Sequence, residues 1–280
     1  MALDNTIDQP AERPAAPPKT WSAARITGVV LCGLWVVLGL LLVWSLISGY
    51  DPELLERYAP RMLGGLWLTA KMVVLSIVMG SALALPIALA RTSTSKIVSK
   101  LAFGYVYFFR GTPLLAQLFL TYYGAGQFRP FMEDIGLWWF FKDAFNCVML
   151  AFTLNTAAYQ GEILKGAIQS VPKGQHEAAS TLGLSGPVTF FKIILPQALI
   201  TALRPLGNEV IFMIKGSAIA SVVTILDLMG TTKLAYSRSY DFNVYVWAAL
   251  LYLSMVETLR YFWDRMERYL TRHLRMPNED

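Results

Sequence analysis

Cysteine, histidine and charge are all scarce in this sequence. Its 280 residues include 2 Cys and 2 His, and only 15% are Asp, Glu, Lys or Arg. Cys32 and Cys147 fall in apolar runs, and His176 and His273 lie far apart in the chain. A disulfide framework, a zinc cluster and a histidine-based catalytic triad therefore all lack the residues they require.

Motifs for nucleotide binding and nucleophilic catalysis are also missing. No Gly-x-x-x-x-Gly-Lys-Ser/Thr occurs, although Gly230-Thr231-Thr232-Lys233 has similar residues at another spacing. Gly183-Leu184-Ser185-Gly186 has one residue too few for a nucleophile elbow. We therefore expect no catalytic, metal or cofactor site in this chain, so ATP and magnesium, if they are needed, belong to another polypeptide.

Hydrophobic residues are what the sequence has in abundance. They make up 55% of the chain, and the mean hydropathy is +0.45. Six mainly apolar runs are long enough to cross a hydrocarbon core of roughly 30 Å, namely 26–49, 62–90, 98–124, 144–165, 197–225 and 243–263. This pattern predicts an all-α polytopic membrane protein with six transmembrane helices in a lipid bilayer.

The remaining segments predict the organisation of the chain. Residues 1–20 are polar and rich in proline, which is typical of a disordered tail. Residues 21–61 would form an N-terminal transmembrane helix and an external loop, and the apolar run is too long for a cleaved signal sequence. Residues 62–275 would form the main domain.

Lys and Arg are distributed unevenly between the two ends of these spans. Only six lie on one side, namely Arg57, Arg61, Arg129, Lys142, Lys233 and Arg238. The larger group shares its side with both termini and with residues 172–196, so the positive-inside rule places these in the cytoplasm. The net charge of +5 thus reflects topology, and we expect no nucleic-acid partner.

Residues 172–196 read as a water-facing helix-turn-helix in an otherwise apolar chain. Lys173 to Leu182 would form a short helix, which Gly183 would end in the left-handed conformation. Ser185 would cap a second, apolar helix, which Pro196 would stop.

The first of these helices has the composition of a docking surface. Ala178 and Ala179 would be exposed small residues that let a partner approach closely, and Glu177 would orient that partner. An amphipathic helix lying on the lipid surface is the alternative.

The spacing within this segment resembles the signature of a known family. That signature is Glu-Ala-Ala, three residues, Gly, nine residues and Ile-x-Leu-Pro, as in the inner-membrane permease subunits of binding-protein-dependent ABC importers. This chain matches it at Glu177, Ala178, Ala179, Gly183, Ile193, Leu195 and Pro196. The resemblance implies a coupling helix that lies in a groove of a separate ATP-binding subunit, a second permease subunit, identical or similar, and a periplasmic substrate-binding protein, all at a bacterial inner membrane.

Further motifs resemble the polar amino-acid branch, with its permeases for histidine, for lysine, arginine and ornithine, and for opines. They are Arg110-Gly111-Thr112-Pro113, Leu154-Asn155-Thr156-Ala157-Ala158-Tyr159-x-x-Glu162 and Asn208-Glu209-Val210-Ile211. The resemblance covers about residues 62–275 and implies a five-helix type I importer core. Residues 26–49 are an addition whose role it does not imply.

Polar residues inside the fourth span are candidates for a substrate path, because an ionisable group in lipid is costly unless it faces protein or water. Asn155, Tyr159 and Glu162 are spaced to share one helix face. This face would hold a cationic or zwitterionic amino acid. Buried hydrogen bonds between helices are the alternative reading.

The third and fifth spans add further candidates. Asn208 and Lys215 share a face with Arg204 in the fifth span, whereas Glu209 would point elsewhere and act as a structural partner. Arg110 precedes a Gly-Thr-Pro break that predicts a bend and a possible gate.

A stripe of small residues follows the second span at four-residue intervals, formed by Ser76, Gly80, Ala84 and Ala88. Such a stripe lets another helix come close, either within this chain or from a partner permease.

Two other classes of membrane protein remain as alternatives to an importer permease. A stand-alone secondary transporter would use intramembrane carboxylates as ion relays and would show inverted repeats, yet the sequence has no evident internal repeat. A purely structural or signalling protein is the other alternative.

Overall fold

The computed structural model describes residues 22–49 and 51–272, and all regular structure in these residues is helical. The all-α prediction is therefore confirmed, while the tail predicted at residues 1–20 lies outside the described residues. The chain divides into two units, Met1–Tyr50 and Asp51–Asp280.

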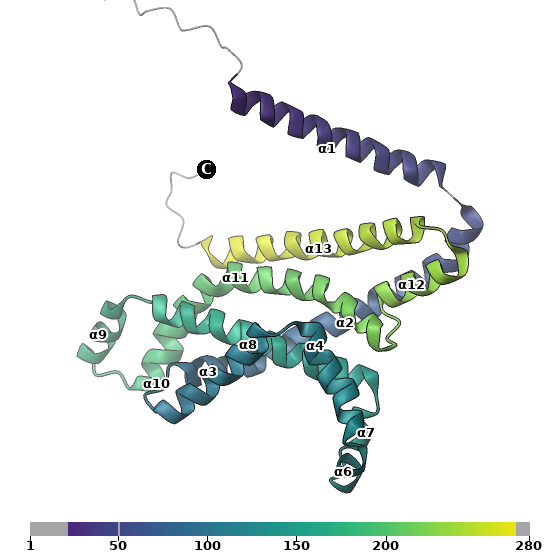
Figure 1. Cartoon of the computed structure of the whole chain (residues 1–280). Helices are drawn as coiled ribbons and strands as arrows, with labels where there is room; N and C mark the ends of the chain where they lie inside the picture. Colours follow the sequence, from purple (N-terminus) through teal and green to yellow (C-terminus); the bar gives the residue numbers. More distant parts are fainter. Residues whose placement is uncertain (1–21, 50, 273–280) are drawn as a thin grey trace, which may run out of the picture. The chain divides into compact units, whose positions relative to one another are not determined.

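The first unit contains α1 (Ala23–Ser48). The second contains α2 (Pro52–Arg91), α3 (Lys96–Gly111), α4 (Leu114–Phe119), the π-helical turn η1 (Leu120–Gly124), α5 (Ala125–Gln127), α6 (Arg129–Asp134), α7 (Trp138–Phe141), α8 (Ala144–Ser170), α9 (Lys173–Thr181), α10 (Gly186–Thr189), the π-helical turn η2 (Phe190–Ile194), α11 (Leu195–Gly216), the 3-10 helix η3 (Ser217–Val223), α12 (Leu228–Ser239) and α13 (Asn243–Leu270) (Figure 1).

Helices long and apolar enough to cross a membrane occur in three places in the described residues, at Ala23–Ser48, Pro52–Arg91 and the continuous run Gly186–Val223. Helices α8 and α13 have 27 and 28 residues. At 1.5 Å per residue each reaches about 40 Å, which is also sufficient to cross.

The predicted third span is broken, as its Gly-Thr-Pro sequence indicated. Helix α3 ends at Gly111, and α4 begins at Leu114 after Pro113, whose φ is −62° and ψ 137°. The prediction of a bend at this point is confirmed.

Residues 52–61, which the sequence suggested as part of a loop, form the first turns of α2. Asp51 caps this helix because its Oδ1 accepts hydrogen bonds from the backbone N–H of Glu53 (2.9 Å) and Leu54 (3.2 Å). Pro52 needs no N–H donor in the first turn. The helix therefore extends beyond its apolar run.

The small-residue stripe of α2 packs against α8 within this chain. Ser76, Gly80, Ala84 and Ala88 are all buried. A Cβ at Gly80 would lie 2.6 Å from Thr156 Cγ2, so the two helices approach too closely for a side chain at this position. Of the two readings of the stripe, packing inside the chain is the one observed.

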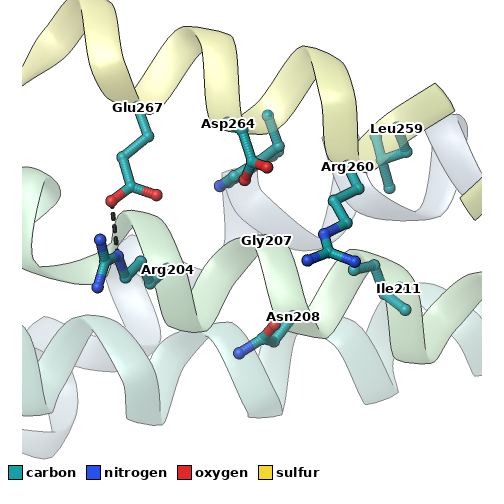
Figure 2. Close-up of a pocket in the computed structure, with 9 residues that line it drawn as sticks. Arg204, Gly207, Asn208, Ile211, Leu259, Arg260, Asp264 and Glu267 are labelled. Carbon is teal, nitrogen blue, oxygen red and sulfur yellow. Dashed lines mark hydrogen bonds and ion pairs between the residues drawn. The ribbon is translucent and has the colours of Figure 1, made fainter. Parts of the chain in front are cut away.

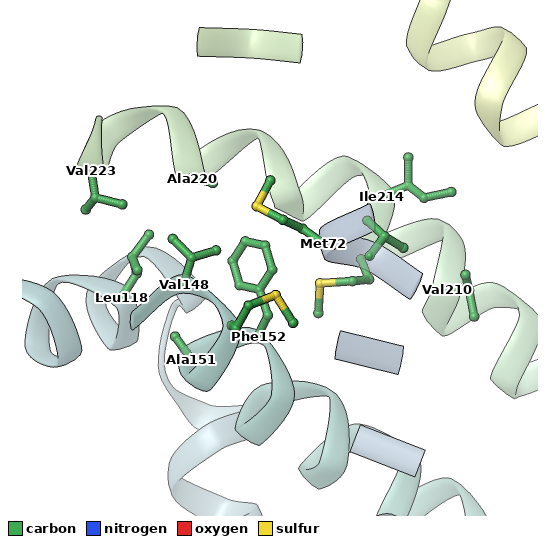
Figure 3. Close-up of a cluster of buried hydrophobic side chains, with 12 residues drawn as sticks. Met72, Leu118, Val148, Ala151, Phe152, Val210, Ile214, Ala220 and Val223 are labelled. Atoms are coloured by element: carbon green, nitrogen blue, oxygen red, sulfur yellow. The ribbon is translucent and has the colours of Figure 1, made fainter. Parts of the chain in front are cut away.

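A hydrophobic core joins α2 and α8 to α4, α11 and η3. Met72, Phe152 and Val223 are among its buried members, together with Leu118 and Ile214 (Figure 3). This core fixes α2, α8 and α11 relative to one another, and these three helices carry most of the polar residues considered below.

Helix α13 runs beside α11 (Figure 1). Trp263 Nε1 donates a hydrogen bond to the Leu203 carbonyl at 3.0 Å. Gly207 leaves room for this ring, because a Cβ there would lie 2.5 Å from Trp263 Nε1.

Candidate functional site

The segment between α8 and α11 forms the turn that its sequence predicts. Helix α9 ends at Thr181, and Gly183 has φ +68°. The N–H of Leu184 then bonds to the Ala179 carbonyl (3.0 Å), and that of Gly183 bonds to the Ser180 carbonyl (3.0 Å). The left-handed glycine thus reverses the chain between two helical arms, which we call the elbow (Lys173–Ile194).

Two predictions about the second arm are wrong. Pro196 does not stop it, since α11 begins at Leu195 with Pro196 in its first turn. The preceding π-helical turn η2 joins the arm to α11, with the Leu195 N–H bonded to the Phe190 carbonyl. Ser185 lies at the cap position, but its side chain makes no capping hydrogen bond.

The two alanines of the signature face opposite ways. Ala178 and Glu177 are exposed, whereas Ala179 is 1% exposed, so the expectation that both alanines are exposed is wrong. Ile194, beyond the signature's Ile193, is fully buried in a cluster with Val171 and Ala198. Buried side chains therefore anchor the elbow to the helical bundle.

Apolar side chains cover the outside of the elbow. Leu182 is 75% exposed and Phe191 57% exposed, and Leu184 and Val188 are also exposed. Together with Glu177 they form a mixed apolar and charged surface that is suited to a protein partner.

A cavity of about 530 Å³ lies between α3, α4, α8 and α11, which is within the usual size range of small-molecule sites. Four of the predicted substrate-path residues line it, namely Arg110, Asn155, Tyr159 and Asn208. Glu209 lines it as well. Lys215 and Glu162 do not.

Asn155 is fixed at the cavity wall by the broken third span. Its Nδ2 donates to the Phe109 carbonyl (3.1 Å) and to Gln117 Oε1 (3.0 Å). Gln117 Nε2 in turn donates to the carbonyls of Phe109 (2.9 Å) and Thr112 (3.0 Å). The carbonyls freed by the break at Pro113 thus hold these two amides in place.

Glu209 is 6% exposed and is held by a chain of hydrogen bonds across three helices. Gln160 Nε2 donates to Glu209 Oε2 at 3.3 Å, and Ser81 Oγ donates to Gln160 Oε1 at 2.7 Å. The structural partnership expected for Glu209 exists, yet its carboxylate also lines the cavity. Helical spacing alone did not reveal this, because the position depends on how α11 packs against α8.

Arg110 supplies the positive charge of the cavity. Its guanidinium lies 5.2 Å from the centroid of the Tyr159 ring, a distance at which a cation and a ring attract each other. The cavity therefore holds a guanidinium on α3 and a carboxylate on α11.

Glu162 lies one turn beyond Tyr159 in a different environment. Its carboxylate pairs with Arg91 Nε (3.2 Å) and Lys165 Nζ (2.8 Å). It shares a separate hollow with Arg91, Arg110 and Tyr159. Two internal cations thus already satisfy this carboxylate.

Arg204 faces a second hollow, of about 290 Å³, between α11 and α13. Figure 2 shows its ion pair with Glu267, in which Nε and Oε1 are 2.6 Å apart. Asn208 lines this hollow too, so it lies between the two cavities. Arg204, Asn208 and Lys215 share a face on a helical projection, but they do not line one common cavity.

The sequence was compared with models of known protein families. Residues 72–276 match the family described as "Binding-protein-dependent transport system inner membrane component". The chain belongs to this family. It is thus a multi-pass inner-membrane permease subunit of an ABC transporter, and it is not itself catalytic.

Curated relatives of this permease span most of its length. It is 40% identical over 80% of its residues to the nopaline transport system permease protein NocM of Agrobacterium fabrum (strain C58), 94% of which is covered. It is 39% identical over 73% of its residues to the octopine transport system permease protein OccM of Rhizobium radiobacter, 83% of which is covered. It is 35% identical over 70% of its residues to the arginine ABC transporter permease protein ArtM of Escherichia coli (strain K12), 88% of which is covered.

Solved structures share the fold of this permease. The chain of a structure described as an amino acid ABC transporter with histidines has a TM-score of 0.69 at 34% identity, with 79% of this permease and 99% of that chain covered. An inward-facing MetNI methionine ABC transporter chain has a TM-score of 0.57 at 19% identity, with coverage of 79% and 97%, and shows the likeness of fold alone. Family membership settles the choice among the three classes of membrane protein in favour of the importer permease.

Proposed function

We propose that this permease moves basic amino acids, or opines built from them, inward across a bacterial inner membrane. The names of its relatives, which include permeases for nopaline, octopine and arginine, support this substrate class. A separate pair of ATP-binding subunits would hydrolyse ATP with magnesium, a periplasmic binding protein would deliver the substrate, and a second permease subunit would complete the path.

The cavity is the structural observation that supports this substrate class. A basic amino acid has an α-carboxylate at one end and a cation at the other, and the cavity places Arg110 and Glu209 on different helices around one volume. Arg110 would bind the carboxylate, and Glu209 would bind the cationic group. The amide of Asn208, which makes no side-chain hydrogen bond within the described residues, would contact the middle of the substrate.

The elbow would transmit ATP-driven motion to this cavity. Its exposed face, from Glu177 to Phe191, would lie in a groove of the ATP-binding subunit. Because η2 and α11 form one continuous helical run from the elbow to Asn208 and Glu209, a displacement of the elbow would move the cavity wall directly. This is a rigid-element route between the two sites.

Six membrane crossings, with both termini and the elbow in the cytoplasm, complete the proposal. The distribution of Lys and Arg supports it, and so do the helices that cover the six apolar runs, the third of which is broken at Pro113. Helix α1 would be an additional crossing before the five-helix core.

Coupling is tested by a charge reversal on the elbow. The permease, reconstituted with its ATP-binding subunits in lipid nanodiscs, is assayed for ATPase activity with and without loaded binding protein. Glu177→Lys is expected to abolish most of the stimulation, because the reversed charge opposes docking of the ATP-binding subunit.

Gln175→Lys is the matched control, since it adds a lysine to the same exposed helix and keeps Glu177. It should assemble and respond as the wild type does. Full assembly and stimulation in Glu177→Lys would show that the elbow is not the coupling element.

A further inference from the structure

The outer end of α2 and helix α12 enclose a hollow of about 430 Å³ that the transport path does not use. Tyr58, Arg61, Gly64 and Gly65 line it from α2, and Thr231, Leu234 and Arg238 line it from α12, together with Leu226. Each helix thus contributes one arginine, at 61 and 238. None of the described residues that line this hollow is acidic.

The two helices meet in a close and well-anchored contact. A Cβ at Gly65 would lie 2.6 Å from Thr231 Oγ1 and 2.7 Å from the Asp227 carbonyl oxygen, so only glycine permits this approach. Deeper in the same contact, the Leu228 N–H donates to Thr69 Oγ1 at 3.0 Å. The floor of the hollow is therefore rigid.

Arg61 is positioned by a buried ring. Tyr58 is 3% exposed and packs with Ala235 of α12 and Val244 of α13. The Arg61 guanidinium lies 5.9 Å from the centroid of this ring. Tyr58 therefore holds Arg61 over the hollow while leaving its N–H donors available.

Neither arginine has a counterion among the residues that the structure describes. The ion pairs among the described residues involve Arg91, Arg129, Lys165, Arg204 and Arg260, and none involves Arg61 or Arg238. The acidic residues at the start of α2, Asp51, Glu53 and Glu56, line a different hollow with Leu54 and Arg57. Two unpaired guanidinium groups over an apolar floor are suited to a carboxylate, which arginine binds in a bidentate manner.

We propose that this hollow, the Arg61–Arg238 pocket, receives an acidic side chain of the periplasmic binding protein and thereby docks it on the permease. The proposal rests on the proposed function, because the direction of transport and the Lys and Arg distribution place this end of α2 in the periplasm. Both arginines lie on the side where the positive-inside rule disfavours basic residues. A specific acidic partner on that side explains why these positions are basic.

Titration of nanodisc-bound transporter with its loaded binding protein tests the pocket. ATPase activity is measured as the binding protein is raised to saturation. In Arg61→Glu/Arg238→Glu the half-saturating concentration is expected to rise about 10-fold or more, with the maximal rate retained, because reversing a docking charge acts on association. The single variants Arg61→Gln and Arg238→Gln are expected to give smaller shifts in the same direction.

Arg57→Glu is the control, since it reverses one arginine's charge one turn away on α2 but outside the pocket. Its half-saturating concentration should equal that of the wild type. The docking pocket is overturned if the half-saturating concentration is unchanged in the double variant and in both single variants. It is also overturned if Arg57→Glu shifts this concentration as much as the double variant does.

A comparison of lipids separates the binding protein from a net anionic phospholipid as the occupant. Phosphatidylcholine nanodiscs are compared with nanodiscs that contain phosphatidylglycerol, and the docking pocket predicts the same shift in both. A shift that occurs only with phosphatidylglycerol assigns the pocket to lipid and overturns the proposal. Failure of the wild type to respond to loaded binding protein would instead contradict the proposed function itself.

Discussion

Glu209 and Glu162 are two carboxylates on the inner helices, and their surroundings differ. Glu209 borders the cavity and accepts one hydrogen bond, from Gln160. Glu162 is neutralised by Arg91 and Lys165. The sequence singled out Glu162 because it is aligned with Asn155 and Tyr159, whereas ion pairs to other positions cannot be deduced from spacing along one helix.

Glu209→Gln is expected to weaken uptake of arginine about 10-fold or more, mainly through KM, and to affect glutamine much less. The amide keeps an acceptor for Gln160 but removes the charge, and a hydrogen bond to a charged group contributes about 1.5–3 kcal/mol. The ratio of arginine uptake to glutamine uptake is measured in proteoliposomes for the variant and the wild type. An equal loss for arginine and glutamine would remove Glu209 from substrate recognition.

Glu162→Gln is expected to leave the arginine-to-glutamine ratio unchanged and to destabilise the fold. It leaves Arg91 and Lys165, whose side chains are 11% and 19% exposed, without a carboxylate. The expected loss in the free energy of unfolding is on the order of 2 kcal/mol. It is measured as a lower unfolding midpoint in detergent. A changed substrate ratio would restore Glu162 as a substrate contact.

The elbow depends on the backbone of one residue, Gly183. Its φ of +68° strains any residue with a Cβ, although nothing lies within 4 Å of where the Cβ would be. Gly183→Ala should therefore cost about 1–2 kcal/mol and reduce ATPase stimulation, and Gly183→Asn should be milder because Asn tolerates this conformation. Gly186→Ala is the control in the same turn, and equal effects of all three would contradict a conformational role.

The contact between α2 and α8 depends on the absence of a side chain at Gly80. Gly80→Ala is expected to lower stability by about 1–3 kcal/mol, as overpacking does, because its Cβ would meet Thr156. Gly166→Ala in α8 has open space and should be neutral or stabilising. Unfolding midpoints in detergent compare the two, and a Gly80→Ala protein as stable as the wild type would contradict the packing.

The sequence predicted the bounds of the elements best where a single glycine or proline determines the backbone conformation. The left-handed Gly183 and the break before Pro113 both follow from their own chemistry. The prediction that Pro196 ends the second arm was wrong because the π-helical turn η2 widens the helix just before it. The proline therefore falls in the first turn of α11. The burial of Ala179 likewise depends on tertiary packing, since α9 contacts η2 of the second arm.

At the scale of the whole molecule, the sequence was sufficient for the membrane class and the family. Apolar runs and the spacing of the signature are properties of the chain itself. The cavity was only partly predictable, since it brings together Arg110 from α3, Asn155 from α8 and Glu209 from α11. Which faces of these helices meet is decided by packing, such as the close contact at Gly80.

The central claim is that this permease, with its ATP-binding subunits, imports a basic amino acid delivered by a binding protein. The most direct measurement is accumulation of labelled arginine, relative to labelled glutamine, in proteoliposomes that hold the complete transporter, with loaded binding protein on the side opposite to ATP. We expect arginine accumulation that requires both ATP and the binding protein and that falls selectively in Glu209→Gln. Accumulation without ATP or without the binding protein, or no preference for the basic amino acid, would contradict the claim.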